Sequence, residues 1–233
     1  MTYIKALDDV AVIIQARLGS QRVPQKMIRP FADTTLTDIA LMKIKQCKSF
    51  PIENFYLSVH EPELLTIGQK HGVNIYRRSE KSANSEGTPM TEMYEWWNKL
   101  PCKYGVLVNA CAPFLTSETI DSFFDAYRRS QSDGMFGVIE KKNYYWDFGG
   151  KLITPLTEAV MNTKTVQTTY EAAHCLYAGR LDKIGQSVWM GDFSHPGDIE
   201  LFPMKEEEVL DVDYEWQFRA YESMYEYRKG TST

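Results

Sequence analysis

Two groups of charged residues stand near opposite ends of this 233-residue chain, and they suit ions of opposite sign. The first is cationic and lies in "ARLGSQRVPQKMIR" (residues 16–29), directly after the apolar run Val10–Ile14. The second is the carboxylate pair Asp211 and Asp213 in "EVLDVDYEW" (residues 208–216). The whole chain has a net charge of −5, so the cations are a local exception that favours a small anion over a nucleic acid.

The cationic segment is typical of a loop that follows a buried strand, but it matches neither of two common phosphate-binding loops. No second glycine precedes Lys26, as the Gly-x-x-x-x-Gly-Lys-Ser/Thr pattern requires. Gly19 is the only candidate for the three glycines of a dinucleotide fingerprint. Two interpretations stay open, a phosphate loop of a third kind and a solvated cationic loop beside a strand. The several constraints that coincide at fixed spacing favour the first.

The two carboxylates are separated by one residue, between Leu210 and Val212. On an extended segment residues i and i+2 lie on one face, so both side chains can enter the same cleft. Two hard oxygen donors suit Mg²⁺, which takes one or two protein carboxylates together with phosphate oxygens and water. The alternative is that Asp213 only caps a helix beginning near Tyr214 while Asp211 is solvated.

Alternating strands and helices from residue 10 to 140 are expected to position the cationic loop. Such alternation at intervals of about 20 residues indicates βαβ units around a parallel sheet, whose ligands bind at the carboxyl ends of the strands. The predicted strands are 10–14, 54–60, 73–78, 104–110 and 134–140. The predicted helices are 34–50 with Thr35 or Thr37 as cap, 61–72 with Pro62 near its start and Gly72 at its end, 90–100 before Pro101, and 117–130 capped by Ser117.

The remaining third of the chain has a different pattern. Gly149–Gly150, flanked by Tyr144, Tyr145, Trp146 and Phe148, predicts a hairpin. A strand over 172–179, an extended segment over 199–204, and a strand running into an amphipathic helix over 206–227 follow. Because no repeat or low-complexity linker divides the chain, we expect a single domain over 1–233 with an inserted arm at about 141–170.

The loop residues "ARLGSQRVPQKMI" resemble the Ala-Arg-x-Gly-Ser-x-Arg-x-Pro-x-Lys signature of the CMP-sugar synthetases, the acylneuraminate and 3-deoxy-octulosonate cytidylyltransferases. The resemblance implies a Rossmann-like α/β fold, with a mostly parallel sheet flanked by helices and a small dimerisation arm. Gly19 and Ser20 would then form a tight turn that faces a triphosphate, and Pro24 would stiffen the return of the loop. The chain departs from the family at Gln21 and Met27, at "NAC" (109–111), where Gln, Pro and Thr are usual, and at Val166, which precedes Gln167 in place of an Arg.

The resemblance also assigns roles to residues along the whole chain. The reaction would be attack of a sugar hydroxyl on the α-phosphate of CTP, with pyrophosphate leaving and Mg²⁺ as the cofactor. The implied acceptor is a nonulosonic or related 2-keto-3-deoxy sugar acid. The implied site comprises Arg17, Lys26 and Asp211 in catalysis; Ala16, Arg17, Gly19, Ser20, Gln21, Lys26, Arg78 and Ser85 at the nucleotide; Asn109 and Gln167 at the acceptor; and Asp211 and Asp213 at the metal.

Three interpretations of function remain. "IIQARLGSQRVP" also resembles transferases of the spore-coat polysaccharide type, although the Asp-x-Asp and its following aromatic helix favour the CMP-sugar synthetases. A non-catalytic nucleotide-binding homologue is the third, and the four retained charged residues Arg17, Lys26, Asp211 and Asp213 oppose it. His174 and His195 are candidates for proton transfer, although a lone histidine is more often structural.

The composition indicates in which cellular compartment the protein is expected and which partners it is expected to bind. No apolar run approaches the roughly 18 residues of a membrane span, and "MTYIKALDD" lacks the apolar core of a signal peptide. The four cysteines have no CxxC spacing, which predicts a reduced cytoplasmic compartment and no structural zinc site. The expected partners are therefore CTP, a sugar acid and a second copy of the chain, with neither nucleic acid nor membrane.

Overall fold

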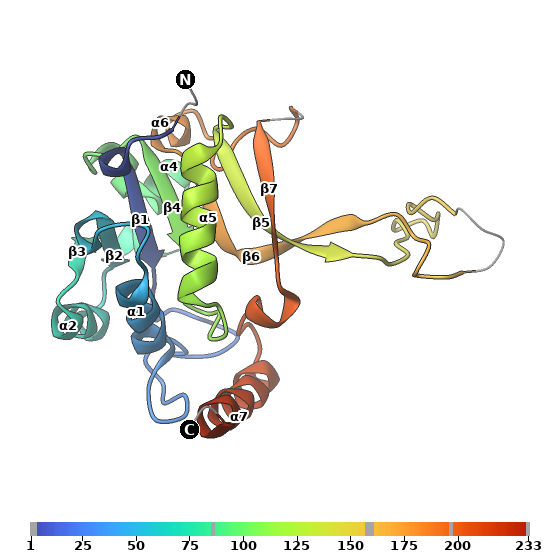
Figure 1. The fold of residues 1–233 in the computed structure, drawn as a ribbon. Helices are drawn as coiled ribbons and strands as arrows, with labels where there is room; N and C mark the ends of the chain where they lie inside the picture. The colour runs from blue at the N-terminus through green and yellow to red at the C-terminus, as the bar shows by residue number, and fades with distance from the viewer. Residues whose placement is uncertain (1–3, 85–86, 157–160, 196–197, 232–233) are drawn as a thin grey trace.

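The computed structural model describes residues 4–84, 87–156, 161–195 and 198–231, and contains a seven-stranded sheet (Figure 1). The order of the strands is β3-β2-β1-β4-β6-β5-β7. β6 is antiparallel to both of its neighbours and the other pairings are parallel, which confirms the mostly parallel α/β fold. The strands are β1 (Val10–Gln15), β2 (Phe55–Val59), β3 (Asn74–Arg77), β4 (Tyr104–Val108), β5 (Gly134–Lys141), β6 (Thr169–Arg180) and β7 (Ile199–Met204).

Helices cover both faces of the sheet because successive residues of β1 point to opposite sides. Val10, Val12 and Ile14 enter a large core shared with α1, α2, α5 and α7. Ala11 and Ile13 enter a second, smaller core with Trp96 and α6. The helices are α1 (Leu36–Gln46), α2 (Pro62–His71), α3 (Glu80–Ala83), α4 (Met90–Met93), α5 (Ser117–Arg129), α6 (Leu181–Ile184) and α7 (Glu215–Thr231), with 3₁₀ turns at Leu7–Asp9, Ile52–Asn54, Glu95–Asn98 and Glu206–Glu208.

Helix ends follow local sequence chemistry, with one correction. Thr35 caps α1 by accepting a hydrogen bond from the N–H of Asp38, and Gly72 ends α2 in the left-handed conformation at φ 66°. The cap of α5 is Thr116, not Ser117 as predicted, because the Thr116 side chain accepts from the N–H of Thr119 and Ser117 is already helical.

Two predicted elements are interrupted. The helix expected over 90–100 ends at Met93 and resumes as a 3₁₀ turn, because Tyr94 leaves the helical conformation and Trp96 turns into the second core. There the indole Nε1 of Trp96 donates to Gln15 at 2.8 Å. The strand expected before the last helix is replaced by a 3₁₀ turn and by a segment without regular secondary structure, 209–213. The Val212 N–H of this segment donates to the carbonyl of Cys111 at 3.0 Å.

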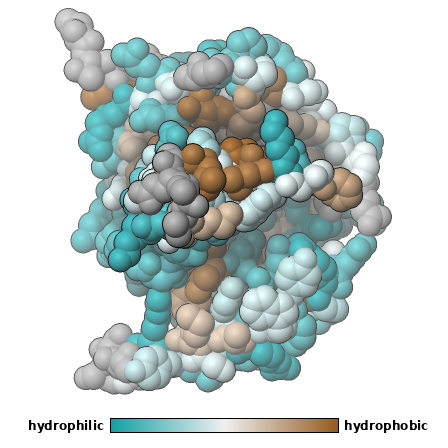
Figure 2. Space-filling view, turned by 90° about the vertical axis from the view of Figure 1, so that its right-hand side faces the viewer, coloured by the Kyte–Doolittle hydropathy of each residue, from teal (hydrophilic) through white to brown (hydrophobic). Residues whose placement is uncertain are grey.

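An arm leaves the body where β5 and β6 run on together (Figure 1). Their ladder extends to the Lys141–Thr169 pair, and a Trp146–Leu152 bridge closes the hairpin predicted around Gly149 and Gly150. Figure 2 looks onto this side of the molecule and shows hydrophobic side chains gathered among hydrophilic ones. The large apolar side chains exposed on the described part of the arm are Trp146, Phe148, Ile153, Leu156 and Met161.

Within the described ranges, no helix combines the length and the apolar character that crossing a membrane requires.

Candidate active site

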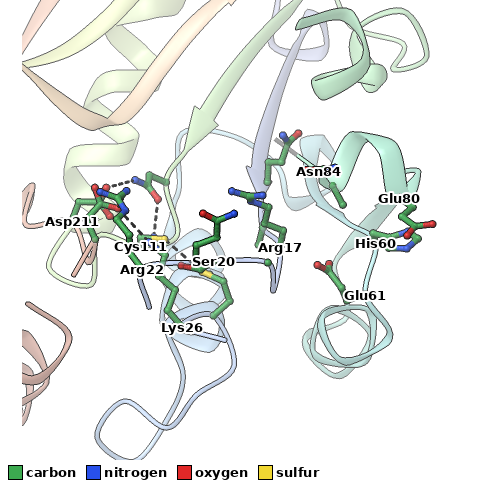
Figure 3. A pocket seen from close by; sticks show the side chains of 18 residues that line it. Arg17, Ser20, Arg22, Lys26, His60, Glu61, Glu80, Asn84, Cys111 and Asp211 are labelled. Atoms are coloured by element: carbon green, nitrogen blue, oxygen red, sulfur yellow. Dashed lines mark hydrogen bonds and ion pairs between the residues drawn. The ribbon is translucent and has the colours of Figure 1, made fainter. Parts of the chain in front are cut away.

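A cavity of about 840 Å³ lies at the carboxyl ends of the central parallel strands (Figure 3). The loop after β1 forms its middle, the residues after β2 and β3 form one end, and the loop after β4 meets Asp211 at the other end. This is where a parallel sheet places a ligand. Of the predicted site residues, the cavity brings together Ala16, Arg17, Gly19, Ser20, Gln21, Lys26, Asn109, Asp211 and Asp213.

The loop after β1 is anchored by buried apolar residues and by backbone bonds. Val23 and Met27 are buried, and the Met27 carbonyl accepts from both the N–H and the hydroxyl of Thr37 in α1. Gln25, rather than Gly19, takes a left-handed conformation, at φ 54°. With the loop anchored at these points, the side chain of Arg17 lines the cavity.

The cationic loop and the segment with Asp211 and Asp213, which are about 190 residues apart in the sequence, are in contact. Arg22 donates to Asp213 at 2.8 Å, and the Lys26 ammonium lies 3.6 Å from the same carboxylate and donates to the Val212 carbonyl. Farther along, Arg29 makes two bonds to Glu215 at 2.6 and 2.8 Å. The cationic loop and the Asp-x-Asp segment therefore form one site.

Asp211 is the more enclosed of the two carboxylates. Its Oδ2 accepts from the Asn109 amide at 3.3 Å, and its Oδ1 is shielded from solvent without a partner among the described residues. Burial raises the pKa of the Asp211 carboxyl, while the nearby Lys26 opposes the increase. A buried carboxylate oxygen without a donor is costly in an empty cleft and is suited to a cation.

The start of α7 shows how the segment that carries Asp213 is held. The amide oxygen of Gln217 accepts from the backbone N–H groups of Asp213 and Tyr214, at 2.8 and 2.9 Å. These two N–H groups precede Glu215, the first residue of α7, so the bonds fix the approach of the chain to the helix. The Asp213 carboxylate pairs with Arg22 and lies near Lys26 of the cationic loop.

The donor set at this end suits a hard divalent ion that shares its coordination with a substrate. Nowhere in the described part of the chain do three or more His, Cys, Asp or Glu side chains group as a closed metal site. Two carboxylates, one with an oxygen lacking any donor, fit the coordination of Mg²⁺ with phosphate oxygens and water in the other positions.

Asn109 ties three segments together. Its side-chain N–H groups donate to the His174 carbonyl at 2.9 Å and to Asp211, and its Oδ1 accepts from the Cys111 N–H at 2.8 Å. Its hydrogen-bonding capacity is therefore largely used within the protein. Burial raises the pKa of the neighbouring Cys111 thiol to about 11, so this cysteine is not a thiolate nucleophile at neutral pH.

A second cavity, of about 560 Å³, adjoins the first. It lies among the base of the arm, the segment 209–213 and the start of α7, and it shares Asn109, Asp211 and Asp213 with the larger cavity. Two compartments therefore meet at the carboxylate pair, which is the arrangement that a transfer between two substrates requires.

Two residues of the predicted site, Arg78 and Gln167, lie away from the larger cavity. The Arg78 guanidinium is buried, donates to the carbonyls of Ala16 and Ser82 at 2.7 and 3.2 Å, and so supports the loop from behind rather than lining the cavity. Burial lowers the pKa of Arg78 to about 10. Gln167 lines neither cavity, and Ser85 lies outside the described residues.

Sequence reasoning missed the wall of the larger cavity that follows β2 and β3. His60 and Glu61 follow β2 there, and the far wall adds Glu80 of α3 and Asn84, the residue directly after α3 (Figure 3). One oxygen of Glu61 accepts from the Leu18 N–H at 2.7 Å, and the other is buried without a partner among the described residues. Their position at the ends of the predicted strands 54–60 and 73–78, or shortly after them, was the available signal, because those ends share one edge of the sheet.

Comparison with known proteins identifies a family for the chain. The sequence profile of the family described as "Cytidylyltransferase" matches residues 11–212. The flagellin modification protein B of Campylobacter coli is 22% identical over 93% of this chain and 94% of its own length. Spore coat polysaccharide biosynthesis protein SpsF of Bacillus subtilis is 26% identical over 54% of this chain and 53% of its own. The 3-deoxy-manno-octulosonate cytidylyltransferase of Rickettsia felis is 28% identical over 57% and 52%.

Solved structures share the fold. A CMP:2-keto-3-deoxy-manno-octonic acid synthetase complexed with CTP superposes with a TM-score of 0.66 at 12% identity, covering 92% of this chain and 97% of that one. The 4-diphosphocytidyl-2C-methyl-D-erythritol synthase of Anaerococcus prevotii gives a TM-score of 0.65 at 13% identity, covering 92% and 95%. At these identities the likeness concerns the fold alone.

Proposed function

This chain belongs to the cytidylyltransferase family, and on that premise we propose that it transfers CMP from CTP to a hydroxyl of a 2-keto-3-deoxy sugar acid. The observation that carries the proposal is the meeting of two cavities at Asp211 and Asp213. CTP occupies the larger cavity with its phosphates against the cationic loop, and the acceptor occupies the smaller one.

In this mechanism the acceptor oxygen attacks the α-phosphorus, a new O–P bond forms, and the bond to the pyrophosphate oxygen breaks. Arg17 and Lys26 offset the charge on the departing phosphates. Asp211 and Asp213 would hold Mg²⁺, which when bound polarises the α-phosphate and lowers the pKa of an attacking hydroxyl. Arg22, which pairs with Asp213 at 2.8 Å, is free to turn to a phosphate once a cation neutralises that carboxylate.

The acceptor class rests on the resemblance of the loop and on the relative named as a 3-deoxy-manno-octulosonate cytidylyltransferase. A second candidate, an acceptor without a carboxylate, is favoured by the charges around the smaller cavity. Lys141 lies there beside Glu206, which it contacts, and Glu171, 3.8 Å away. A single paired lysine is a weak receptor for a sugar carboxylate unless another group joins it.

Pyrophosphate release tests both points. We expect release with CTP and a sugar acid such as N-acetylneuraminate or 3-deoxy-octulosonate, and little release when UTP, ATP or GTP replaces CTP. Neutral hexoses and amino sugars in the same panel test the second candidate. Equal turnover with a purine nucleotide would reject the cytidylyl transfer.

A further inference from the structure

β6 carries a large irregularity beside the carboxylate pair, where it bends between the arm and the body (Figure 1). Phe136 of β5 pairs with Tyr177, but Val138, only two residues on, pairs with Ala172. Residues 173–176 of β6 therefore oppose Gly137 alone. A bulge of this kind turns side chains toward a site that a regular strand does not reach.

His174 lies in this bulge in the left-handed backbone conformation, at φ 54°. The conformation is unfavourable for a residue with a side chain, and it persists only when surrounding contacts enforce it. Asn109 supplies two such contacts, because its side chain donates to the His174 carbonyl and its backbone N–H donates to the Cys175 carbonyl, both at 2.9 Å. Gly137 lets the bulge approach β5 closely, since a Cβ there would lie 3.2 Å from the carbonyl oxygen of Leu176.

The ring of His174 is oriented by one neighbour and otherwise available. Its Nδ1 lies 3.2 Å from the hydroxyl of Tyr177. Within the described part of the chain, the structure gives Nε2 no partner. The side chain lines the smaller cavity together with Asp211 and Asp213.

We propose that His174 is the base that accepts the proton of the acceptor hydroxyl. The inference deepens the proposed function and rests on it. As the acceptor oxygen forms its bond to the α-phosphorus, the O–H bond breaks and its proton passes to Nε2. The α-phosphorus–oxygen bond to pyrophosphate breaks with its electron pair on the leaving group, so that no further reactant is needed.

The charged groups that line the smaller cavity around His174 come from four parts of its wall. β5 and β6 provide a cation and an acid, the 3₁₀ turn provides a second acid, and the segment before α7 provides the carboxylate pair. These groups are Lys141, Glu171, Glu206, Asp211 and Asp213. The phenols of Tyr177, Tyr214 and Tyr221 line the same space, and burial raises the pKa values of Tyr177 and Tyr221 further above neutrality.

The test uses His174→Gln and His174→Gly in the full-length protein, with His195→Gln as the matched control. His195 pairs with Asp192 on an exposed loop and lines neither cavity. Because general base catalysis typically contributes about 10²–10⁴-fold, we expect both His174 variants to lose at least tenfold in kcat and to keep their affinity for CTP. The fall in kcat on the acidic side of the wild-type pH profile should move to lower pH in His174→Gln, where only the carboxylates remain to be protonated, and should be unchanged in His195→Gln.

His174→Gly gives a readout that a structural role does not produce. Glycine adopts positive φ without strain, so the variant should fold and leave space where the ring was. Added imidazole should then restore part of its activity. Normal kcat in His174→Gln, or an unchanged acidic limb, overturns the inference. Wild-type protein that releases no pyrophosphate from CTP rejects the proposed function instead, so the two failures are distinguishable.

Discussion

At the scale of single residues, the carboxylate pair Asp211 and Asp213 can be tested by substitution. Asp211→Asn and Asp213→Asn keep the shape of each side chain and remove an anionic oxygen. If both residues hold the metal, each variant should lose about 10²–10³ in kcat, as is typical when one electrostatic contact to a transition state is removed. Steady-state pyrophosphate release across a range of Mg²⁺ concentrations measures this, and partial recovery at high Mg²⁺ or Mn²⁺ is expected.

The control for this pair is Glu215→Gln, which changes an exposed carboxylate that binds Arg29 outside both cavities. It should retain most activity, since surface ion pairs contribute only about 0–1 kcal/mol. Near-normal rates in both Asp variants at low millimolar Mg²⁺ would contradict the metal assignment.

The raised pKa of Asp211 also predicts how the free energy of unfolding depends on pH when no metal is added. Its folded pKa is raised, so its carboxyl binds a proton more tightly in the folded than in the unfolded state. Stability from this group is therefore complete below the unfolded value, about 3.9, and is lost as pH rises through the folded pKa. Asp211→Asn should remove that loss, and its melting temperature without Mg²⁺ at pH 7 should equal or exceed that of the wild type. A clearly lower melting temperature there would show that the charged carboxylate stabilises the fold.

At the scale of elements, Lys43 joins α1 to the loop after β4. Its ammonium donates to the carbonyls of Ala112 and Pro113 at 2.9 and 2.6 Å, and burial lowers the pKa of Lys43 to about 7, against the attraction of Glu208. Because the unfolded state binds this proton more tightly, stability should rise with pH between about 7 and the ordinary lysine value of about 10.4.

Lys43→Met should lower the free energy of unfolding by about 1–3 kcal/mol, since it leaves two carbonyls without a donor, and it should reduce the increase with pH, of which Lys5, with its pKa lowered by burial to about 8, keeps a part. Thermal unfolding at pH 7 and pH 9 measures both effects. Lys45→Met is the control, because Lys45 donates only to the exposed His71 carbonyl. An unchanged slope with pH in Lys43→Met would exclude Lys43 as the source.

The elements also show what sequence alone could predict. β1 was predictable because Val10–Ile14 is a continuous apolar run, and Gly72 and Pro62 marked the ends of α2. The break of the helix at Tyr94 was not predictable, because it depends on the packing of Trp96 against residues about 90 positions later in the chain. The signals that end a helix are neighbours in the sequence, whereas the break at Tyr94 is caused by a tertiary contact.

The candidate site divides in the same way. Its charged residues could be identified from the types and spacing of residues 16–29 and 211–213. The positioning role of Asn109 depends on the bulge of β6, and the burial of Arg78 depends on the approach of α3 to the loop, neither of which leaves a pattern in the sequence. The sequence therefore identified the charged segments of the candidate site, but it left open which of their side chains line the cavities.

At the scale of the whole molecule, the arm is the feature that a lone chain does not explain. Side chains such as Trp146, Phe148 and Ile153 are exposed there, Phe148 fully so. Contiguous exposed apolar groups of this kind mark an interaction surface. A second copy of the chain is the partner we expect, and the arm begins at Lys141 and Thr169, so an arm that crosses to its partner leaves directly from the smaller cavity.

The prediction is that the protein is a dimer in solution and that the arm holds it together. Replacing Trp146, Phe148 and Ile153 together by Ser removes apolar contact area without touching either cavity, so the variant should sediment as a folded monomer at micromolar concentration while the wild type sediments as a dimer. A matched triple replacement on the outer face of α7, at Trp216, Met224 and Tyr227, which are also exposed, should leave the dimer intact.

If the partner subunit completes the acceptor site, the arm variant should bind CTP normally but show a raised KM for the sugar, because only the cavity at the base of the arm loses contact with the partner. A wild-type protein that is monomeric and fully active at micromolar concentration would reject the arm as a dimer contact. Dissociation of the α7 variant alone would show that the dimer interface lies on α7 and not on the arm.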